Sequence, residues 1–170
     1  LGGVHHTIEI CDINSNKNDH ILGKWTRMPV GFSFTTRCIA VIDDDTIVSG
    51  SWDYSLKIWN VDSREEIKKL NGHSGYVDCV AVIDNDRIVS GSYDHTLKIW
   101  NVNSGEVIHT LTGHSDRVYC VAVINKDTIV SGSRDRSLKI WDVTSGKEIQ
   151  TLIGHRDTVK CLVVIDEDTI

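Results

Sequence analysis

The 170-residue sequence lacks several features that would point to particular classes of protein. No apolar run approaches the roughly 18 consecutive residues that a transmembrane helix requires, so we expect no membrane insertion. No excess of positive charge exists either, because 18 basic and 24 acidic residues give a formal net charge of −6. Proteins that bind nucleic acid non-specifically need a basic surface, so that class is not expected here.

The cysteines form no close pair of the CxxC kind, so the sequence gives no indication of a zinc site. Four of the five recur every 41 residues, at Cys38, Cys79, Cys120 and Cys161. Equivalent positions of successive repeats lie too far apart for a disulfide, which needs Cα atoms within about 7 Å. We therefore expect buried, reduced thiols, no bound metal and an intracellular location, cytoplasmic or nuclear.

What the sequence does contain is a repeat. Residues 47–61, 88–102 and 129–143 read IVSGSWDYSLKIWNV, IVSGSYDHTLKIWNV and IVSGSRDRSLKIWDV, with a constant period of 41 residues. A period of this size is typical of stacked repeat architectures. Within the clearest unit, residues 118–153, four short strand signals alternate with polar turns, and nothing has helical spacing. The pattern predicts an all-β fold of four-stranded antiparallel meanders. The first strand, Val118–Ile124, is nearly all apolar and is expected to be buried on both faces.

A Gly-His pair stands 27 residues before the Trp of two of the three Trp-Asn or Trp-Asp pairs, as His73 does before Trp100, with SGSxD between them. This wording resembles the WD-repeat (WD40) β-propeller family over essentially the whole chain. The resemblance implies a ring of four-stranded blades that we expect to be seven-bladed. The run IVSGSxDxTLKIW looks most like the propellers of F-box/WD-repeat substrate receptors of ubiquitin ligases.

On this template the whole chain, residues 1–170, is a partial propeller. Full blades are predicted at 36–71, 77–112 and 118–153, a degenerate partial blade at 1–28 and the start of a further blade at 159–170. The two end pieces fit either a closed four-bladed ring or two blades of a larger one, and propellers run from about 4 to 8 blades. We expect a fragment of the larger ring, because both ends fall within a blade.

Ser and Asp recur in every full repeat and His joins them in two, and these are the residue types of a hydrolase triad. The resemblance implies instead a structural network, in which Asp accepts from His, His meets the Ser hydroxyl, and that hydroxyl accepts from the Trp indole. A serine oxygen occupied by an indole donor is a poor nucleophile, and a catalytic site occurs once. We therefore expect no enzyme, no cofactor and no small-molecule substrate. The network positions are Ser49, Asp53 and Trp59; His73, Ser90, Asp94 and Trp100; and His114, Ser131, Asp135 and Trp141. Phe32 replaces the first His.

The positions at which the repeats differ indicate where function is expected. They lie just before the network Asp and near the start of the innermost strand, and the resemblance places both around the mouth of the central channel. Trp, Tyr and Arg are enriched among interface hot spots. The candidate partner-binding residues are Arg37, Trp52, Tyr76, Tyr93, Arg117, Tyr119, Arg134, Arg136 and Lys160.

Basic residues gather in the last full blade and its junction with the next. They are Arg117, Arg134, Arg136, Arg156 and Lys160. Arginine clusters recognise acidic or phosphorylated peptides, although solvated rim charges are the simpler interpretation. In the F-box receptors, arginines at the positions of Arg134 and Arg37, and one matched here by Lys160, contact a phosphorylated degron. Asp78 and Tyr119 depart from that pattern.

The predicted function is non-catalytic protein–protein recognition. One hypothesis is a substrate-recognition propeller of a ubiquitin-ligase-type complex that binds an acidic or phosphorylated peptide. The alternative is a general assembly scaffold in multiprotein complexes. In both, the partners are proteins or peptides, with no nucleic acid and no membrane.

Overall fold

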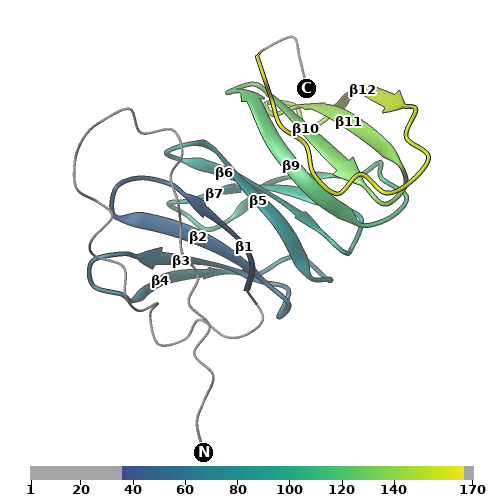
Figure 1. Cartoon of the computed structure of the whole chain (residues 1–170). Coiled ribbons are helices and arrows are strands. Elements are labelled where there is room, and N and C mark those ends of the chain that lie inside the picture. The colour runs from purple at the N-terminus through teal and green to yellow at the C-terminus, as the bar shows by residue number, and fades with distance from the viewer. Residues whose placement is uncertain (1–35, 167–170) are drawn as a thin grey trace, which may run out of the picture.

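The computed structural model describes residues 36–166, and the regular elements in that range are β-strands (Figure 1). Twelve strands form three four-stranded antiparallel sheets. Within the described range there is no helix with the length and apolar character needed to cross a membrane. The prediction of an all-β fold is confirmed.

Each sheet is a meander in which consecutive strands are neighbours. The first sheet contains β1 (Thr36–Val41), β2 (Thr46–Ser51), β3 (Leu56–Asn60) and β4 (Glu66–Leu70). The second contains β5 (Val77–Asp84), β6 (Arg87–Ser92), β7 (Leu97–Asn101) and β8 (Val107–Leu111). The third contains β9 (Val118–Asn125), β10 (Thr128–Ser133), β11 (Ser137–Asp142) and β12 (Glu148–Ile153).

The three sheets lie side by side like blades, with the first strand of each near a common axis (Figure 1). β5 packs against both β1 and β9, so the innermost strands of neighbouring blades are in contact. The hydrophobic core lies between the blades. Trp100 of the second blade packs with Leu56 and Leu70 of the first, and Trp141 of the third packs with Leu97 and Leu111 of the second. Blade-to-blade stacking therefore buries the largest side chains.

The distribution of burial differs from the sequence-based expectation. The nearly all-apolar innermost strands β5 and β9 are mostly half-buried, whereas β2, β6 and β10 are the most buried strands. The second strands carry the small Ser-Gly-Ser segment. Its glycine lies against the cysteine of the paired first strand and against a valine of the next blade, as Gly91 lies against Cys79 and Val118. The expectation that the first strand is buried on both faces is wrong.

The predicted start of a further blade forms no strand over residues 159–165. Val159 nevertheless occupies the place that a first strand would take: its N–H donates to the Ser133 carbonyl at 3.0 Å, and its side chain lies against Gly132 as Val118 lies against Gly91. Residues 167–170, which follow it, lie outside the described residues, as does the partial blade predicted at 1–28. Ring closure and the number of blades stay predictions.

Candidate functional site

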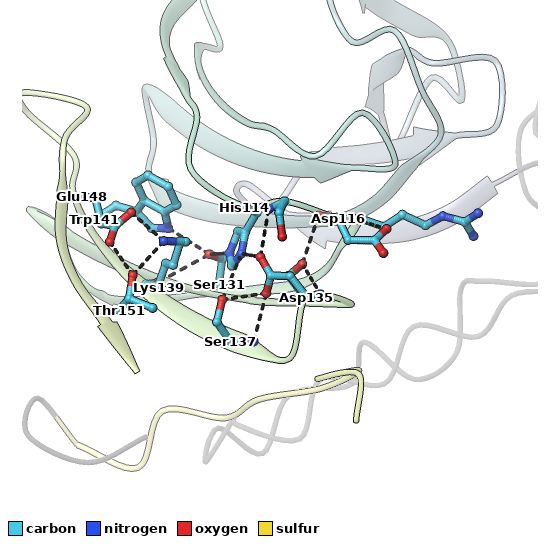
Figure 2. A network of polar contacts seen from close by, with 12 residues as sticks. His114, Asp116, Ser131, Asp135, Ser137, Lys139, Trp141, Glu148 and Thr151 are labelled. Carbon is cyan, nitrogen blue, oxygen red and sulfur yellow. Dashed lines mark hydrogen bonds and ion pairs between the residues drawn. The ribbon is translucent and has the colours of Figure 1, made fainter. Parts of the chain in front are cut away.

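The recurring polar residues form a buried hydrogen-bond chain in the second and third blades. In the third blade (Figure 2), His114 Nδ1 lies 2.7 Å from Asp135 Oδ2 and His114 Nε2 lies 2.8 Å from Ser131 Oγ. The Trp141 indole N–H donates to the same Ser131 oxygen at 2.8 Å. The structure thus contains every contact that the implied network requires.

The second blade repeats this geometry. His73 bridges Asp94 and Ser90 at 2.8 Å on each side, and Trp100 donates to Ser90 at 2.8 Å. Both serines, Ser90 and Ser131, are fully buried. A serine that accepts from an indole and lies away from solvent offers no oxygen to a substrate. The hydrogen bonds instead tie each turn to its blade.

The first blade satisfies its Asp differently. Trp59 still donates to Ser49 at 2.9 Å, but Asp53 pairs with Lys69 at 3.2 Å and accepts from the Ser55 hydroxyl at 2.5 Å. The Asp53 side chain is 43% exposed, whereas that of Asp94 is 9% exposed. Phe32, which replaces the His in sequence, lies outside the described residues.

Burial and hydrogen bonding shift the ionisation of the network. Burial alone would raise the pKa of Asp135, but hydrogen bonds from Ser137 and His114 outweigh it and hold the pKa at about 2. The pKa of Asp94 is lowered further for the same reasons, with His73 and Thr96 as donors. Burial lowers the pKa of His114 below 6.5, against the opposing effect of Asp135. The folded blade therefore favours a neutral His beside an ionised Asp.

We predict that acid destabilises the chain in two ranges. The unfolded His114 takes up a proton near pH 6.5 while the folded one resists it, so stability begins to fall below that pH. Asp135 titrates near 3.8 when unfolded and about 2 when folded, so its contribution is lost as the pH falls from about 4 to 2. Melting temperatures measured from pH 7.5 to 2.5 would record both losses of stability. In the Asp135→Asn variant the melting temperature should depend less on pH between about pH 4 and 2. A melting temperature that is constant over this span would contradict the prediction.

Five of the candidate partner-binding residues form a continuous stack across the three blades, which we call the ladder. The Arg37 guanidinium lies 5.6 Å from the Trp52 ring centroid, and the Trp52 and Tyr76 rings are 5.5 Å apart. Tyr76 meets Tyr93 edge-on at 5.5 Å, and the Arg117 guanidinium stacks 3.4 Å above the Tyr93 ring and contacts its hydroxyl. Cation–π and aromatic contacts thus link one blade to the next.

The backbone sets this arrangement. The Tyr93 N–H donates to the Tyr76 carbonyl at 2.8 Å, and the Arg134 N–H donates to the Arg117 carbonyl at 2.9 Å. In each of these blades, the residue before the network Asp is therefore held beside the residue that precedes the innermost strand. The two variable positions of the repeat meet on one face.

The other candidates lie around the ladder. Arg134 is 3.8 Å from Asp116, and Arg136 and Lys160 are exposed. Tyr119 is half-buried on β9, and within residues 36–166 no ring contact joins it to the ladder. The structure therefore brings most of the predicted surface together without Tyr119.

One residue of this face, Tyr54, was missed from the sequence, and another, Asp78, departs there from the degron-binding pattern and was not predicted as a candidate. The Tyr54 ring lies 5.6 Å from that of Tyr76, and Asp78 accepts from Arg37 Nε at 2.9 Å with a side chain that is only 5% exposed. Tyr54 occupies the position after the network Asp, where the other repeats carry His95 and Arg136. The variation at this position between the repeats could have indicated Tyr54, but only Arg136 was predicted from it.

Three meander sheets stacked as blades, two of them held by a complete buried hydrogen-bond network, are the architecture of a β-propeller. A family model described as WDR41, a β-propeller, matches residues 62–170, and one described as WD domain, G-beta repeat, matches residues 31–60. The chain belongs to the WD-repeat β-propeller family, whose members are generally non-catalytic and bind other proteins.

Solved structures of U3-55K and of the RRP9 WD40 repeats are similar to this chain, each with a TM-score of 0.74 and 32% sequence identity. The similarity covers 78% of this chain and 43% of each of those chains. The small ribosomal subunit protein RACK1y of Oryza sativa subsp. japonica is 58% identical over 33 residues, which is 19% of this chain and 10% of that protein. The chain thus spans less than half the length of these relatives.

Proposed function

We propose that the chain recognises an acidic or phosphorylated peptide segment of a partner protein on the face that carries the ladder. The observation behind this is the group of basic residues at the third-blade end of the face. Arg136, Arg156 and Lys160 are exposed there, and Arg117 and Arg134 adjoin them. Arginine forks suit carboxylate and phosphate groups. The sequence pattern of the repeats favours a substrate-recognition role in a ubiquitin-ligase-type complex.

A second candidate function is an assembly scaffold without peptide selectivity. The description of one relative as a small ribosomal subunit protein favours it. A scaffold would contact the folded surface of its partner, and binding would then not depend on phosphate groups.

We further propose an intracellular location. Cys38, Cys79, Cys120 and Cys161 are free thiols, but only Cys79 and Cys120 are buried; Cys38 is half-buried and Cys161 is exposed, so the expectation that all four are buried is wrong. Burial raises the pKa of Cys38 to about 12 and that of Cys120 to about 11, so these thiols are protonated and unreactive. A set of reduced structural thiols is typical of reducing compartments.

Arg134→Glu tests the proposed function. Binding of the full chain to an array of peptides, each in serine-phosphorylated and unphosphorylated form, would be compared with binding of the variant. Reversing this charge should lower the affinity for the bound phosphopeptides about tenfold, a change of about 1.4 kcal/mol in binding free energy. The matched control is Arg64→Glu, since Arg64 is exposed on the β3–β4 turn at the opposite end of its sheet. Equal binding by parent and Arg134→Glu would exclude phosphate recognition here, and a partner bound equally with and without phosphate would favour the scaffold.

A further inference from the structure

The face that carries the ladder is chemically asymmetric. At its first-blade end, three aromatic side chains are exposed: Trp52 by 45%, Tyr54 by 45% and Tyr76 by 38%. Their rings contact one another through Tyr76, at 5.5 and 5.6 Å. Large aromatic rings that stay exposed while held rigidly by neighbours are the side chains that supply most of the energy of protein interfaces.

Little uncompensated charge accompanies these rings. Arg37 stacks on Trp52 and donates to Asp78 at 2.9 Å, and Lys69 pairs with Asp53 at 3.2 Å. Within residues 36–166, these two cations near the aromatic end are thus paired with carboxylates. An apolar or aromatic side chain of a partner would fit this end better than a phosphate group.

The third-blade end has the opposite character. Its five basic residues face two exposed carboxylates, those of Asp116, 3.8 Å from Arg134, and Asp157. A backbone hydrogen bond from Thr158 lowers the pKa of Asp157, and the nearby charges of Lys160 and Arg136 contribute less. The balance at this end is positive on a chain whose formal net charge is −6.

A shallow cleft beside Arg136 adds room for a ligand group. It is lined by Arg136, Ser115, Ser137 and His155, by Asp135 and Lys139, and by Thr151 and Ile153 of β12. The Asp135 carboxylate already accepts from the Ser137 hydroxyl at 2.6 Å, so the exposed guanidinium of Arg136 is the group here that suits a carboxylate or phosphate of a bound chain.

Backbone conformation supports display at both ends. Tyr54, His95 and Arg136 occupy the same place in the β2–β3, β6–β7 and β10–β11 turns, with φ of 71°, 70° and 70°. The turn conformation is thus shared by the three blades, and the blades differ in the side chain that each turn carries. The turns therefore present an aromatic side chain at one end of the face and a guanidinium at the other.

We propose that this face binds one extended peptide in a fixed direction, with an aromatic or large aliphatic side chain over Trp52, Tyr54 and Tyr76 and acidic side chains over Arg117 and Arg136. This partner chemistry rests on the proposed function. The ladder links the two ends through contacts of 5.5 Å from Tyr76 to Tyr93 and 3.4 Å from Tyr93 to Arg117. An extended chain advances roughly 3.3 Å per residue, so about three residues separate the apolar anchor from the first acidic residue.

The test is selection of a phage-displayed library of random dodecapeptides on the full chain, followed by fluorescence anisotropy of the enriched peptides. We expect enriched sequences to contain an apolar anchor and an acidic residue about three positions apart. Trp52→Ser/Tyr54→Ser and Arg136→Glu should each weaken binding about tenfold. The first loss should disappear when the anchor of the peptide is replaced by Ser, and the second when its acidic residues are replaced by Ser.

The matched controls are Ile67→Ser, on the outer strand of the same blade as Trp52, and Arg64→Glu. Both should bind as the parent does, and melting curves should show that all the variants fold. Enriched peptides that depend on this face but lack the paired anchor and acid would overturn only the present inference. Peptides indifferent to every variant, or a library with no enriched sequence, would overturn the proposed function as well.

Discussion

Asp94→Ala should lower the free energy of unfolding by about 3 kcal/mol, because it leaves several donors without their acceptor. Asp94 Oδ2 accepts from His73 Nδ1 at 2.8 Å and from the Ser74 N–H at 2.9 Å. Its Oδ1 accepts from the Thr96 hydroxyl at 2.7 Å and from the Thr96 N–H at 3.0 Å. The His73 side chain is fully buried, so water cannot replace the lost carboxylate at that position.

The first blade supplies the control for this prediction. Asp53→Ala changes the same residue of the same turn, but Asp53 is largely exposed and pairs with Lys69 instead of a buried His. Water can replace the Lys69 partner, whereas the donors of Ser55, which is 1% exposed, lose their acceptor just as those of Thr96 do in Asp94→Ala. We therefore expect a loss smaller than that of Asp94→Ala by about 1 kcal/mol or more. Urea unfolding at pH 7 measures both variants. If the two losses were equal, the histidine network would not be the source of the stability.

The sequence predicts the network well because all of its members belong to one repeat. Equivalent residues of successive 41-residue units take equivalent places, so the arrangement implied for His114, Ser131 and Trp141 holds for His73, Ser90 and Trp100. Spacing within a unit and the hydrogen-bonding capacity of each side chain suffice for this prediction.

The ladder is less predictable because its contacts cross from blade to blade. Tyr76 reaches back to Trp52 of the preceding blade and across to Tyr93 of its own. Such contacts depend on side-chain length and direction, which a repeat alignment does not encode. For this reason variability identified most residues of the face, while the pairing of Arg37 with Asp78 emerged only from the structure.

The burial of the strands was also predicted wrongly from their apolar content. The apolar strand β9 is half-buried, whereas the Ser-Gly-Ser segment of β10 is fully covered. Apolar content identifies strands that could be buried on both faces, but small residues are what allow two blades to approach closely. The packing around Gly91 makes this point testable.

Gly91→Ala should lower the free energy of unfolding by about 3 kcal/mol through overpacking. A Cβ at this position would lie 2.6 Å from Cys79 Sγ on the paired strand β5 and 2.7 Å from Val118 Cγ1 on β9 of the next blade. Separations this short require the neighbouring atoms to shift. Cys79 belongs to the same blade, but the β-branched Val118 also has its Cβ 3.2 Å away, so relief on that side moves the third blade away from the second. The loss should therefore appear as weaker docking between blades.

Gly154→Ala is the matched control, because a Cβ at Gly154 would meet no atom within 4 Å. We expect it to change stability by no more than about 0.5 kcal/mol. Val118→Ala removes one of the two atoms that oppose the added methyl group. It should be destabilising alone, because it leaves a cavity, yet it should partly rescue Gly91→Ala. Losses in the double variant that simply add would show that contact with Val118 is not the source of the strain. A positive coupling would show that the glycine sets the distance between the blades, and with it the spacing of Tyr76, Tyr93 and Arg117 across the face.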